Sequence, residues 1–299
     1  MATAIQGTYA AVLTPRTETG EIDETAFRGL LEFLLGNGIT GFAINGATGE
    51  FCLTSEEELH RLLGIASETL AGKANVLVGI GSPSAPPSIR LGRVATKFGA
   101  AGLLLPMPYF FPYSQEDLKV FCRTVVANVE APVLLYNLPQ FTSGLEPQTS
   151  LQLIQECDGI IGIKDSSGSL DTLRLLTETG TKAQRIVGND DVLVPALEQG
   201  LLDAVVSGVA CVLPELIGRL YELGSSNSDS SEFRILSSAL ASFTQQLQPF
   251  PTPWGLKIVA EARGVLRATY PIPLSHERES AKAAMLNWFR HNQPQLLAQ

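Results

Sequence analysis

The stretch that decides the fold is GIIGIKDSS, residues 159–167. Isoleucine and glycine alone fill its first five positions, and Lys164 follows them directly. An apolar run of this length, bounded by Asp158 on one side and Asp165 on the other, predicts a fully buried strand that ends at a lysine. Burial disfavours the ammonium form, and the free amine of a lysine is a nucleophile toward carbonyls. The alternative is a structural lysine that reaches water or pairs with Asp165.

The composition excludes several classes of protein. The chain has 299 residues, of which 45% are apolar and 17% are charged, so it is long enough for one large α/β barrel or for two domains. Its net charge of −9 argues against a nucleic-acid or anionic-membrane partner. We therefore expect neither a nucleic acid nor a membrane as a partner.

The cysteines and the start of the chain indicate a compartment. The four cysteines are scattered and form no C-x-x-C pair, which predicts buried thiols in a reducing cytoplasm. The first fifteen residues, MATAIQGTYAAVLTP, lack the basic and long apolar regions of a secretion signal. No apolar run approaches the ~18–20 residues of a membrane span. We expect a cytoplasmic protein.

Strand-like and helix-like segments alternate through residues 1–224. The predicted strands are 8–13, 41–44, 75–80, 102–105, 132–136, 159–164, 185–187 and 203–206. The predicted helices are 26–35, a segment around 59–65, 88–98, 114–129, 151–155, 170–178, 192–199 and 214–223. Thr54 and Glu57 fit a capping box for the second of these helices. Eight such units predict an α/β fold, a (β/α)8 TIM barrel; a doubly wound open sheet is the alternative, but no dinucleotide fingerprint supports it.

The remaining residues, 225–299, do not continue the alternation of strands and helices. A polar connector, GSSNSDSS at 224–231, separates them from the barrel. Three helices are predicted beyond it, over 232–246, 253–263 and 276–291. We interpret this part as a C-terminal three-helix extension on a catalytic barrel of residues 1–224, and not as a second catalytic domain.

Metal and phosphate chemistry find little support. The three histidines, His60, His276 and His291, lie far apart in predicted helices, and no ligand spacing indicates a metal site. Barrels often bind phosphate in the loops after the seventh and eighth strands. Here the first of these loops is Gly188–Asp191, and its two carboxylates, Asp190 and Asp191, repel phosphate.

The chemistry of a barrel lies at the carboxyl ends of its strands. These ends carry Thr48, Tyr136, Lys164, Asp190 and Asp191. A lysine amine, a phenol that shuttles protons, and the backbone amides of a glycine-rich turn at 46–49 are what a Schiff base with a 2-keto acid requires. Each residue also has a structural alternative: Tyr136 can end its strand in water, Thr48 can be a turn residue, and the aspartates can cap the following helix.

Three motifs carry a family resemblance. Asn45–Glu50 (NGATGE), Tyr136–Pro139 (YNLP) and Gly162–Asp165 (GIKD), in this order, resemble the dihydrodipicolinate synthase and N-acetylneuraminate lyase family, and Pro253–Lys257 (PWGLK) is also similar to it. The resemblance covers nearly the whole chain. It implies a barrel with a C-terminal helical extension, usually in a tetramer built from tight dimers.

The resemblance also implies roles for individual residues. Pyruvate forms a Schiff base with Lys164, Tyr136 shuttles protons, and Thr48 holds the pyruvate carboxylate. The carbonyl of Val206 contacts the pyruvyl group. No cofactor is implied beyond this covalent lysine adduct.

Three departures concern the second substrate. Dihydrodipicolinate synthases usually have threonine where Ala47 stands, a second tyrosine from across the dimer where Phe110 stands, and an arginine for the acceptor's carboxylate where Phe141 stands. Phe141 resembles the apolar residue of the sialate lyase and 2-keto-3-deoxy-sugar-acid aldolase branches. Asp190 and Asp191 match positions that bind sugar hydroxyls in the sialate lyases, and carboxylates accept such hydrogen bonds well.

The sequence therefore favours a pyruvate-dependent class I aldolase that cleaves or forms a 2-keto-3-deoxy sugar acid, with pyruvate and a hydroxyaldehyde as partners. One alternative is a dihydrodipicolinate synthase that condenses pyruvate with aspartate semialdehyde. A second alternative is a non-catalytic member that binds a 2-keto acid. We expect a homo-oligomer, a dimer or a tetramer.

Overall fold

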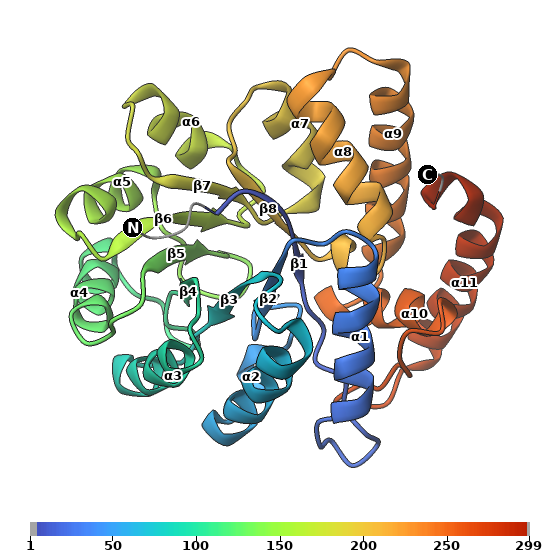
Figure 1. Cartoon of the computed structure of the whole chain (residues 1–299), viewed down its shortest axis with the longest axis horizontal. Coiled ribbons are helices and arrows are strands. Elements are labelled where there is room, and N and C mark those ends of the chain that lie inside the picture. Colours follow the sequence, from blue (N-terminus) through green and yellow to red (C-terminus); the bar gives the residue numbers. More distant parts are fainter. Residues whose placement is uncertain (1–4, 298–299) are drawn as a thin grey trace.

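The computed structural model describes residues 5–297, in which eight parallel strands close into a barrel (Figure 1). The strands are β1 (Gly7–Ala11), β2 (Gly41–Ile44), β3 (Asn75–Gly79), β4 (Gly102–Pro106), β5 (Val133–Asn137), β6 (Ile160–Asp165), β7 (Gln184–Val187) and β8 (Ala204–Ser207). Each strand pairs with the next in the sequence, and β8 pairs with β1 to complete the ring. The predicted (β/α)8 barrel is confirmed.

A helix follows each strand and covers the outside of the barrel (Figure 1). These helices are α1 (Glu24–Gly36), α2 (Glu56–Leu70), α3 (Ala85–Lys97), α4 (Gln115–Val126), α5 (Pro147–Glu156), α6 (Asp171–Glu178), α7 (Leu193–Glu198) and α8 (Pro214–Ser226). Short 3-10 turns, which the sequence pattern did not predict, lie at η1 (Phe51–Leu53), η2 (Asp190–Val192) and η3 (Val209–Cys211). All three follow strand ends, where they shape the loops above the barrel.

One predicted helix cap is wrong. Helix α2 begins after Ser55, whose hydroxyl accepts a hydrogen bond from the backbone N–H of Glu58, while the Glu58 carboxylate accepts one from the backbone N–H of Ser55. The capping box is therefore Ser55 with Glu58, one residue beyond the predicted Thr54 with Glu57. The same T/S-x-x-E spacing occurs in both registers, and the sequence alone does not separate them.

The strands divide their side chains between two cores. One apolar cluster fills the inside of the barrel and includes Tyr9, Leu104, Leu134, Tyr136 and Val206. The larger cluster packs the outer faces of the strands against the helices. Because successive residues of a strand point to opposite faces, β5 places Leu134 and Tyr136 inside the barrel and Leu135 outside.

A β-bulge sets the orientation of β6. Val133 of β5 pairs with Ile160, but Leu134 pairs with Gly162, so Ile161 is an extra residue in β6. Ile160 and Ile163 pack outside the barrel, while Gly162 and Lys164 alternate with Ile163 and face inward. Gly162 is required at its position because an added Cβ would lie 2.1 Å from the carbonyl oxygen of Gln184.

The C-terminal part consists of α9 (Ser231–Leu247), α10 (Thr252–Ala262) and α11 (His276–Leu296), which agrees with the three predicted helices. They lie together along one side of the barrel, with α9 beside α8 (Figure 1). Helix α8 continues to Ser226, so the connector before α9 is shorter than the predicted segment 224–231.

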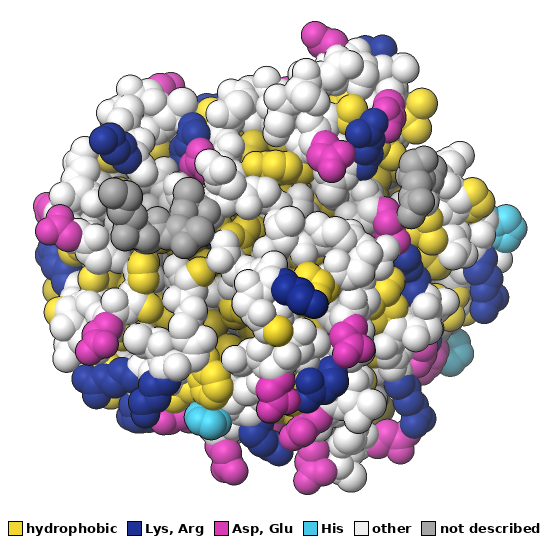
Figure 2. Space-filling model, viewed as in Figure 1, with side chains coloured by type: hydrophobic (Ala, Val, Ile, Leu, Met, Phe, Trp, Pro, Cys, Tyr) yellow, Lys and Arg dark blue, Asp and Glu magenta, His cyan; other side chains and the backbone are white. Residues whose placement is uncertain are grey.

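The cysteines differ in their burial. Cys122 and Cys211 are buried free thiols, but Cys52 is exposed, so the prediction that all the thiols are buried is wrong. Lysine, arginine and acidic side chains are interspersed over the face in Figure 2. Within residues 5–297, no helix is both long enough and apolar enough to cross a bilayer.

Candidate active site

A cavity of about 480 Å³ opens at the carboxyl ends of the strands. Nine of the ten residues predicted for the site line it: Ala47, Thr48, Tyr136, Phe141, Lys164, Gly188, Asp190, Asp191 and Val206. Gly46 is the exception: it does not line the cavity, and its carbonyl accepts a hydrogen bond from the backbone N–H of Phe51. Residues more than 150 positions apart in the chain are thus brought to one place, as parallel strands in a barrel require.

Lys164 and Tyr136 lie next to each other in the lining of the cavity. They are register partners on β6 and β5, and both side chains are almost completely buried. The Lys164 Nζ lies 3.9 Å from the centroid of the Tyr136 ring. Lys164 is the only lysine or arginine among the described residues that line the cavity.

Asp165 does not neutralise Lys164. Its carboxylate accepts hydrogen bonds from the backbone N–H of Ser167 at 2.8 Å and from the Asn137 side chain at 3.3 Å. Asn137 also accepts a hydrogen bond from the backbone N–H of Leu145. Asp165 therefore ties the loops after β5 and β6 together, and the structural alternative for Lys164, an ion pair with this neighbour, is wrong.

Gly188 leaves the space that Lys164 occupies. A Cβ at this position would lie 2.7 Å from Lys164 Cε and 2.2 Å from Ser166 Oγ. Both atoms therefore lie against the backbone at Gly188, directly after β7, which places the Ser166 hydroxyl beside the lysine stem. The position tolerates only glycine without displacing the catalytic candidate.

Ser166 is a site residue that the sequence did not single out. Its hydroxyl is buried in the cavity wall and has no hydrogen-bond partner among residues 5–297. A buried hydroxyl without a hydrogen-bond partner costs free energy of folding, so Ser166 is a candidate for a hydrogen bond to bound substrate. The only signal in the sequence was its place two residues after Lys164.

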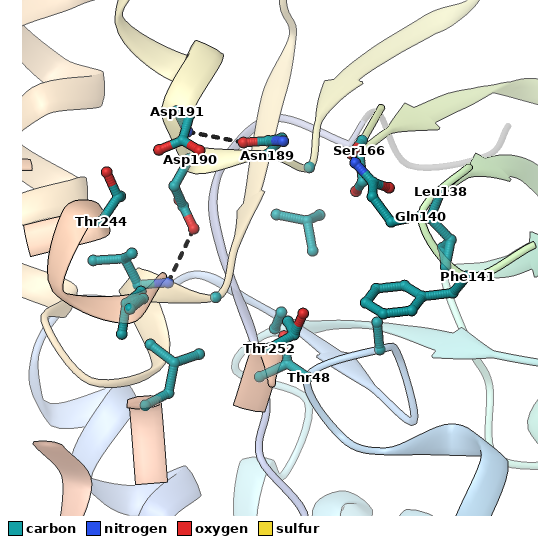
Figure 3. A pocket seen from close by; sticks show the side chains of 18 of the residues that line it. Thr48, Leu138, Gln140, Phe141, Ser166, Asn189, Asp190, Asp191, Thr244 and Thr252 are labelled. Carbon is teal, nitrogen blue, oxygen red and sulfur yellow. Dashed lines mark hydrogen bonds between the residues drawn. The ribbon is translucent and has the colours of Figure 1, made fainter. Parts of the chain in front are cut away.

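Asp190 points into the cavity from the loop after β7 (Figure 3). Its carboxylate accepts hydrogen bonds from the Ser207 hydroxyl and, at 3.2 Å, from the backbone N–H of Val209. Burial raises the pKa of Asp190 to about 6, and the nearby charge of Asp191 adds to the rise, while Lys164 and the two hydrogen bonds oppose it. The structural alternative, a helix cap, is not seen for Asp190, since Asn189 caps this turn by accepting from the backbone N–H of Asp191.

Phe141 and Asp191 occupy the outer part of the cavity. Phe141 is 53% exposed and projects from the loop after β5, on the side opposite Asp190 (Figure 3). Asp191 is exposed at the rim. The entrance therefore combines an aromatic ring with carboxylates.

Thr48 lies in a tight turn after β2. The backbone N–H of Glu50 donates to the carbonyl of Ala47 at 3.0 Å, and the two residues that flank the turn, Asn45 and Glu50, have φ values of 60° and 55°. Ala47 has a methyl side chain and therefore no hydroxyl that could form a hydrogen bond with Tyr136. Thr48 is buried at the cavity wall.

The C-terminal extension closes one side of the cavity, which the sequence interpretation did not foresee. Residues of α9, of α10 and of the segment between them line it: Thr244, Leu247, Gln248, Phe250, Thr252 and Leu256. No motif signals this contact, because these side chains are apolar or weakly polar and come from a segment far from the barrel strands in sequence. The extension is thus part of the site.

Phe110 lies outside the cavity of its own chain. It is 86% exposed, has a φ of 86°, and contacts Phe111 edge-on with 4.8 Å between the ring centroids. A left-handed backbone is unfavourable for a phenylalanine, so the loop holds this ring outward at a cost.

The three histidines lie in helices, as the sequence predicts. All three lie in helices α2 and α11 and none lines the cavity. Among the residues that the structure describes, no group of three or more His, Cys, Asp or Glu side chains could hold a metal ion.

Comparison with known proteins identifies the family. The model of the dihydrodipicolinate synthetase family matches residues 4–289. The chain belongs to the dihydrodipicolinate synthetase family. The resemblance drawn from the NGATGE, YNLP and GIKD motifs is confirmed, and the chain is accordingly a lyase.

Relatives in this family are similar over their full length. A 4-hydroxy-tetrahydrodipicolinate synthase of Methanopyrus kandleri is 32% identical over 281 residues, 93% of each chain. The 4-hydroxy-tetrahydrodipicolinate synthase structure of Methylacidiphilum fumariolicum superposes with a TM-score of 0.89 at 28% identity, over 98% of both chains. A chloride-inhibited dihydrodipicolinate synthase of Acinetobacter baumannii, solved with pyruvate, has a TM-score of 0.86 and 25% identity over 96% of this chain and 98% of its own.

Proposed function

We propose that this member of the family is a class I aldolase that uses pyruvate through a Schiff base on Lys164. The observation that carries the proposal is Lys164 itself, a buried amine in the cavity lining that forms no ion pair with a carboxylate of residues 5–297 and lies against Tyr136. A related synthase was solved with pyruvate, which supports the choice of keto acid.

The reaction uses groups already in place. The Lys164 amine attacks C2 of pyruvate, and loss of water gives the Schiff base. Removal of a C3 proton gives an enamine, whose C3 attacks an aldehyde; hydrolysis then releases the product and the free amine. Tyr136 carries protons between these steps, and the Thr48 turn binds the pyruvate carboxylate.

Aspartate semialdehyde is the acceptor that the comparisons favour. The relatives at 28–32% identity are named 4-hydroxy-tetrahydrodipicolinate synthase. On that basis the condensation of pyruvate with aspartate semialdehyde is the first candidate reaction. The sequence preference for a sugar acid is not confirmed by these relatives.

The charges in the cavity favour the second candidate, a 2-keto-3-deoxy sugar acid. Apart from Lys164, no lysine or arginine of the described chain lines the cavity, so a carboxylate on the acceptor lacks a cation to bind. Asp190, Asp191 and the unpartnered Ser166 hydroxyl are suited to hydroxyl groups instead.

Supplying the two substrates side by side separates these candidates. Pyruvate with aspartate semialdehyde is assayed for condensation, and 2-keto-3-deoxygluconate is assayed for pyruvate release. A clear preference in kcat/KM for either one selects that reaction. A pyruvate adduct on Lys164 with turnover of neither substrate favours the non-catalytic 2-keto-acid binder and excludes both proposed reactions.

We also propose that the chain works as a homo-oligomer. The neighbouring rings of Phe110 and Phe111, 86% and 62% exposed, are an unusual apolar pair to leave in water. Light scattering of the purified protein tests this, and a monomer at micromolar concentration contradicts it.

A further inference from the structure

A buried ion pair joins the C-terminal extension to the turn that carries Thr48. Lys257 of α10 donates from Nζ to the Glu50 carboxylate at 2.6 Å, and only 4% of the Lys257 side chain and 8% of the Glu50 side chain are exposed. The two residues are 207 positions apart in the chain. A pair this deeply buried is expensive to form, so its role in stability alone is a weak explanation for it.

The pair anchors the turn at its strained end. Glu50 has φ 55° and ψ 48°, a left-handed conformation that costs free energy in a glutamate. Its backbone N–H closes the turn onto Ala47, so the position of Glu50 fixes the path of the chain through Thr48. The other end is held by Asn45, whose side chain donates to the Gly79 carbonyl at 2.8 Å.

The extension is itself fixed by further contacts of Lys257. The same ammonium donates to the Thr269 carbonyl at 3.0 Å, and the Thr269 hydroxyl donates to the Arg16 carbonyl at 2.8 Å. Leu256, the neighbour of Lys257, lines the catalytic cavity, as do Ala47 and Thr48 on the other side of the pair. The ion pair between Lys257 and Glu50 therefore fixes the part of the cavity wall that α10 forms relative to the turn that carries Thr48.

We propose that Lys257 and Glu50 are positioning residues that hold the Thr48 turn in the geometry that binds the carboxylate of the keto acid. The inference rests on the proposed function, because it assigns the pair to the pyruvate half of the reaction. Misplacing a binding group by about 1 Å costs on the order of 10²-fold, so loss of the pair should weaken pyruvate binding roughly 10- to 100-fold.

The test compares two double variants. Removing one partner leaves a buried unpaired charge and destabilises the fold, whereas replacing both partners is close to neutral. Glu50→Gln combined with Lys257→Met therefore removes the ion pair while the protein still folds. The matched control is Glu215→Gln with Arg263→Met, which removes a partly buried pair at 2.6 Å between α8 and the residue that directly follows α10, outside the cavity lining.

The readout is the pyruvate concentration that gives half-maximal borohydride trapping on Lys164, measured beside thermal unfolding. We expect this concentration to rise at least tenfold in the Glu50/Lys257 variant, with less change in trapping at saturating pyruvate, and to stay within about twofold in the control. Equal half-maximal concentrations in wild type and a folded Glu50/Lys257 variant overturn the inference. If the double variant does not fold, Glu50→Asp takes its place, because it keeps the paired charges but shortens the reach of the carboxylate, and it must raise the concentration severalfold. Absence of any adduct in the wild type refutes the proposed function instead.

Discussion

Lys164 and Tyr136 are paired residues on adjacent strands, and the amine nitrogen of Lys164 lies 3.9 Å from the centre of the Tyr136 ring. The amine therefore lies over the face of the aromatic ring. Both side chains line the cavity, and the proposed mechanism assigns the attack on a carbonyl to the amine and proton transfer to the Tyr136 hydroxyl. The two side chains thus have separable roles.

Replacing Tyr136 with phenylalanine tests that separation. The ring that supports Lys164 is retained, but the proton-transferring hydroxyl is lost. We expect kcat to fall about 10²- to 10³-fold, while borohydride still traps pyruvate on Lys164. The control is Tyr9→Phe, since Tyr9 is buried inside the same barrel and does not line the cavity. Equal losses in the two variants would contradict the assigned role.

Most of the fold was predictable because its signals are local. Alternating strand and helix patterns gave all eight strands, and the buried strand that ends at Lys164 placed the reactive group on the correct edge. Tyr136, Thr48 and the Asp190 loop followed from the rule that strand ends share one edge of a barrel.

The other parts of the site depend on contacts between distant segments. The wall formed by Phe250, between α9 and α10, and Leu256, in α10, has no local signature, because apolar residues in such segments are equally consistent with ordinary core packing. Ser166 is distinguished by a buried hydroxyl with no hydrogen-bond partner among residues 5–297, and this property depends on the folded structure. The Lys257–Glu50 pair joins residues 207 positions apart, and no periodicity connects them.

Replacing Ser166 with alanine should separate stability from activity. Removing a buried hydroxyl that has no protein partner leaves the free energy of unfolding unchanged or raises it by up to about 1 kcal/mol. If this hydroxyl binds a substrate hydroxyl, kcat/KM for a hydroxylated acceptor falls about tenfold, equivalent to ~1.4 kcal/mol. Chemical denaturation and steady-state kinetics measure the two effects, with Ser238→Ala on the exposed side of α9 as the control. Unchanged kinetics would exclude Ser166 from substrate binding.

Asp190 predicts a specific dependence of stability on pH. Its pKa is about 6 in the folded protein against an ordinary value of 3.8, so between these values the folded state holds a proton that the unfolded state releases. The free energy of unfolding contributed by Asp190 therefore falls as pH rises from about 4 to 6, by on the order of 2–3 kcal/mol.

Urea denaturation across this pH range in wild type and Asp190→Asn measures the effect. The variant should lack the decline, while Asp191→Asn, which changes an exposed neighbour, should keep it. Parallel pH curves for wild type and Asp190→Asn would mean that the carboxyl group does not titrate in this window.

Substitutions of Phe141 test which aldehyde the enzyme prefers as acceptor. Phe141→Arg adds to the cavity entrance the cation that an acidic aldehyde requires. We expect the ratio of kcat/KM for aspartate semialdehyde to that for a neutral hydroxyaldehyde to rise about tenfold, since the half-exposed site is partly screened by water. Phe141→Leu, which preserves an apolar side chain, is the control and should leave the ratio unchanged. An unaltered ratio in Phe141→Arg would show that this position does not face the acceptor.

The central claim is the covalent role of Lys164, and one measurement tests it most directly. The protein is reduced with borohydride in the presence of pyruvate, digested, and mapped by mass spectrometry, with Lys164→Arg treated in parallel. The account predicts a single reduced pyruvyl adduct on the peptide that contains Lys164, and none in the variant. An unmodified Lys164, or an adduct on another lysine such as Lys257, would contradict it.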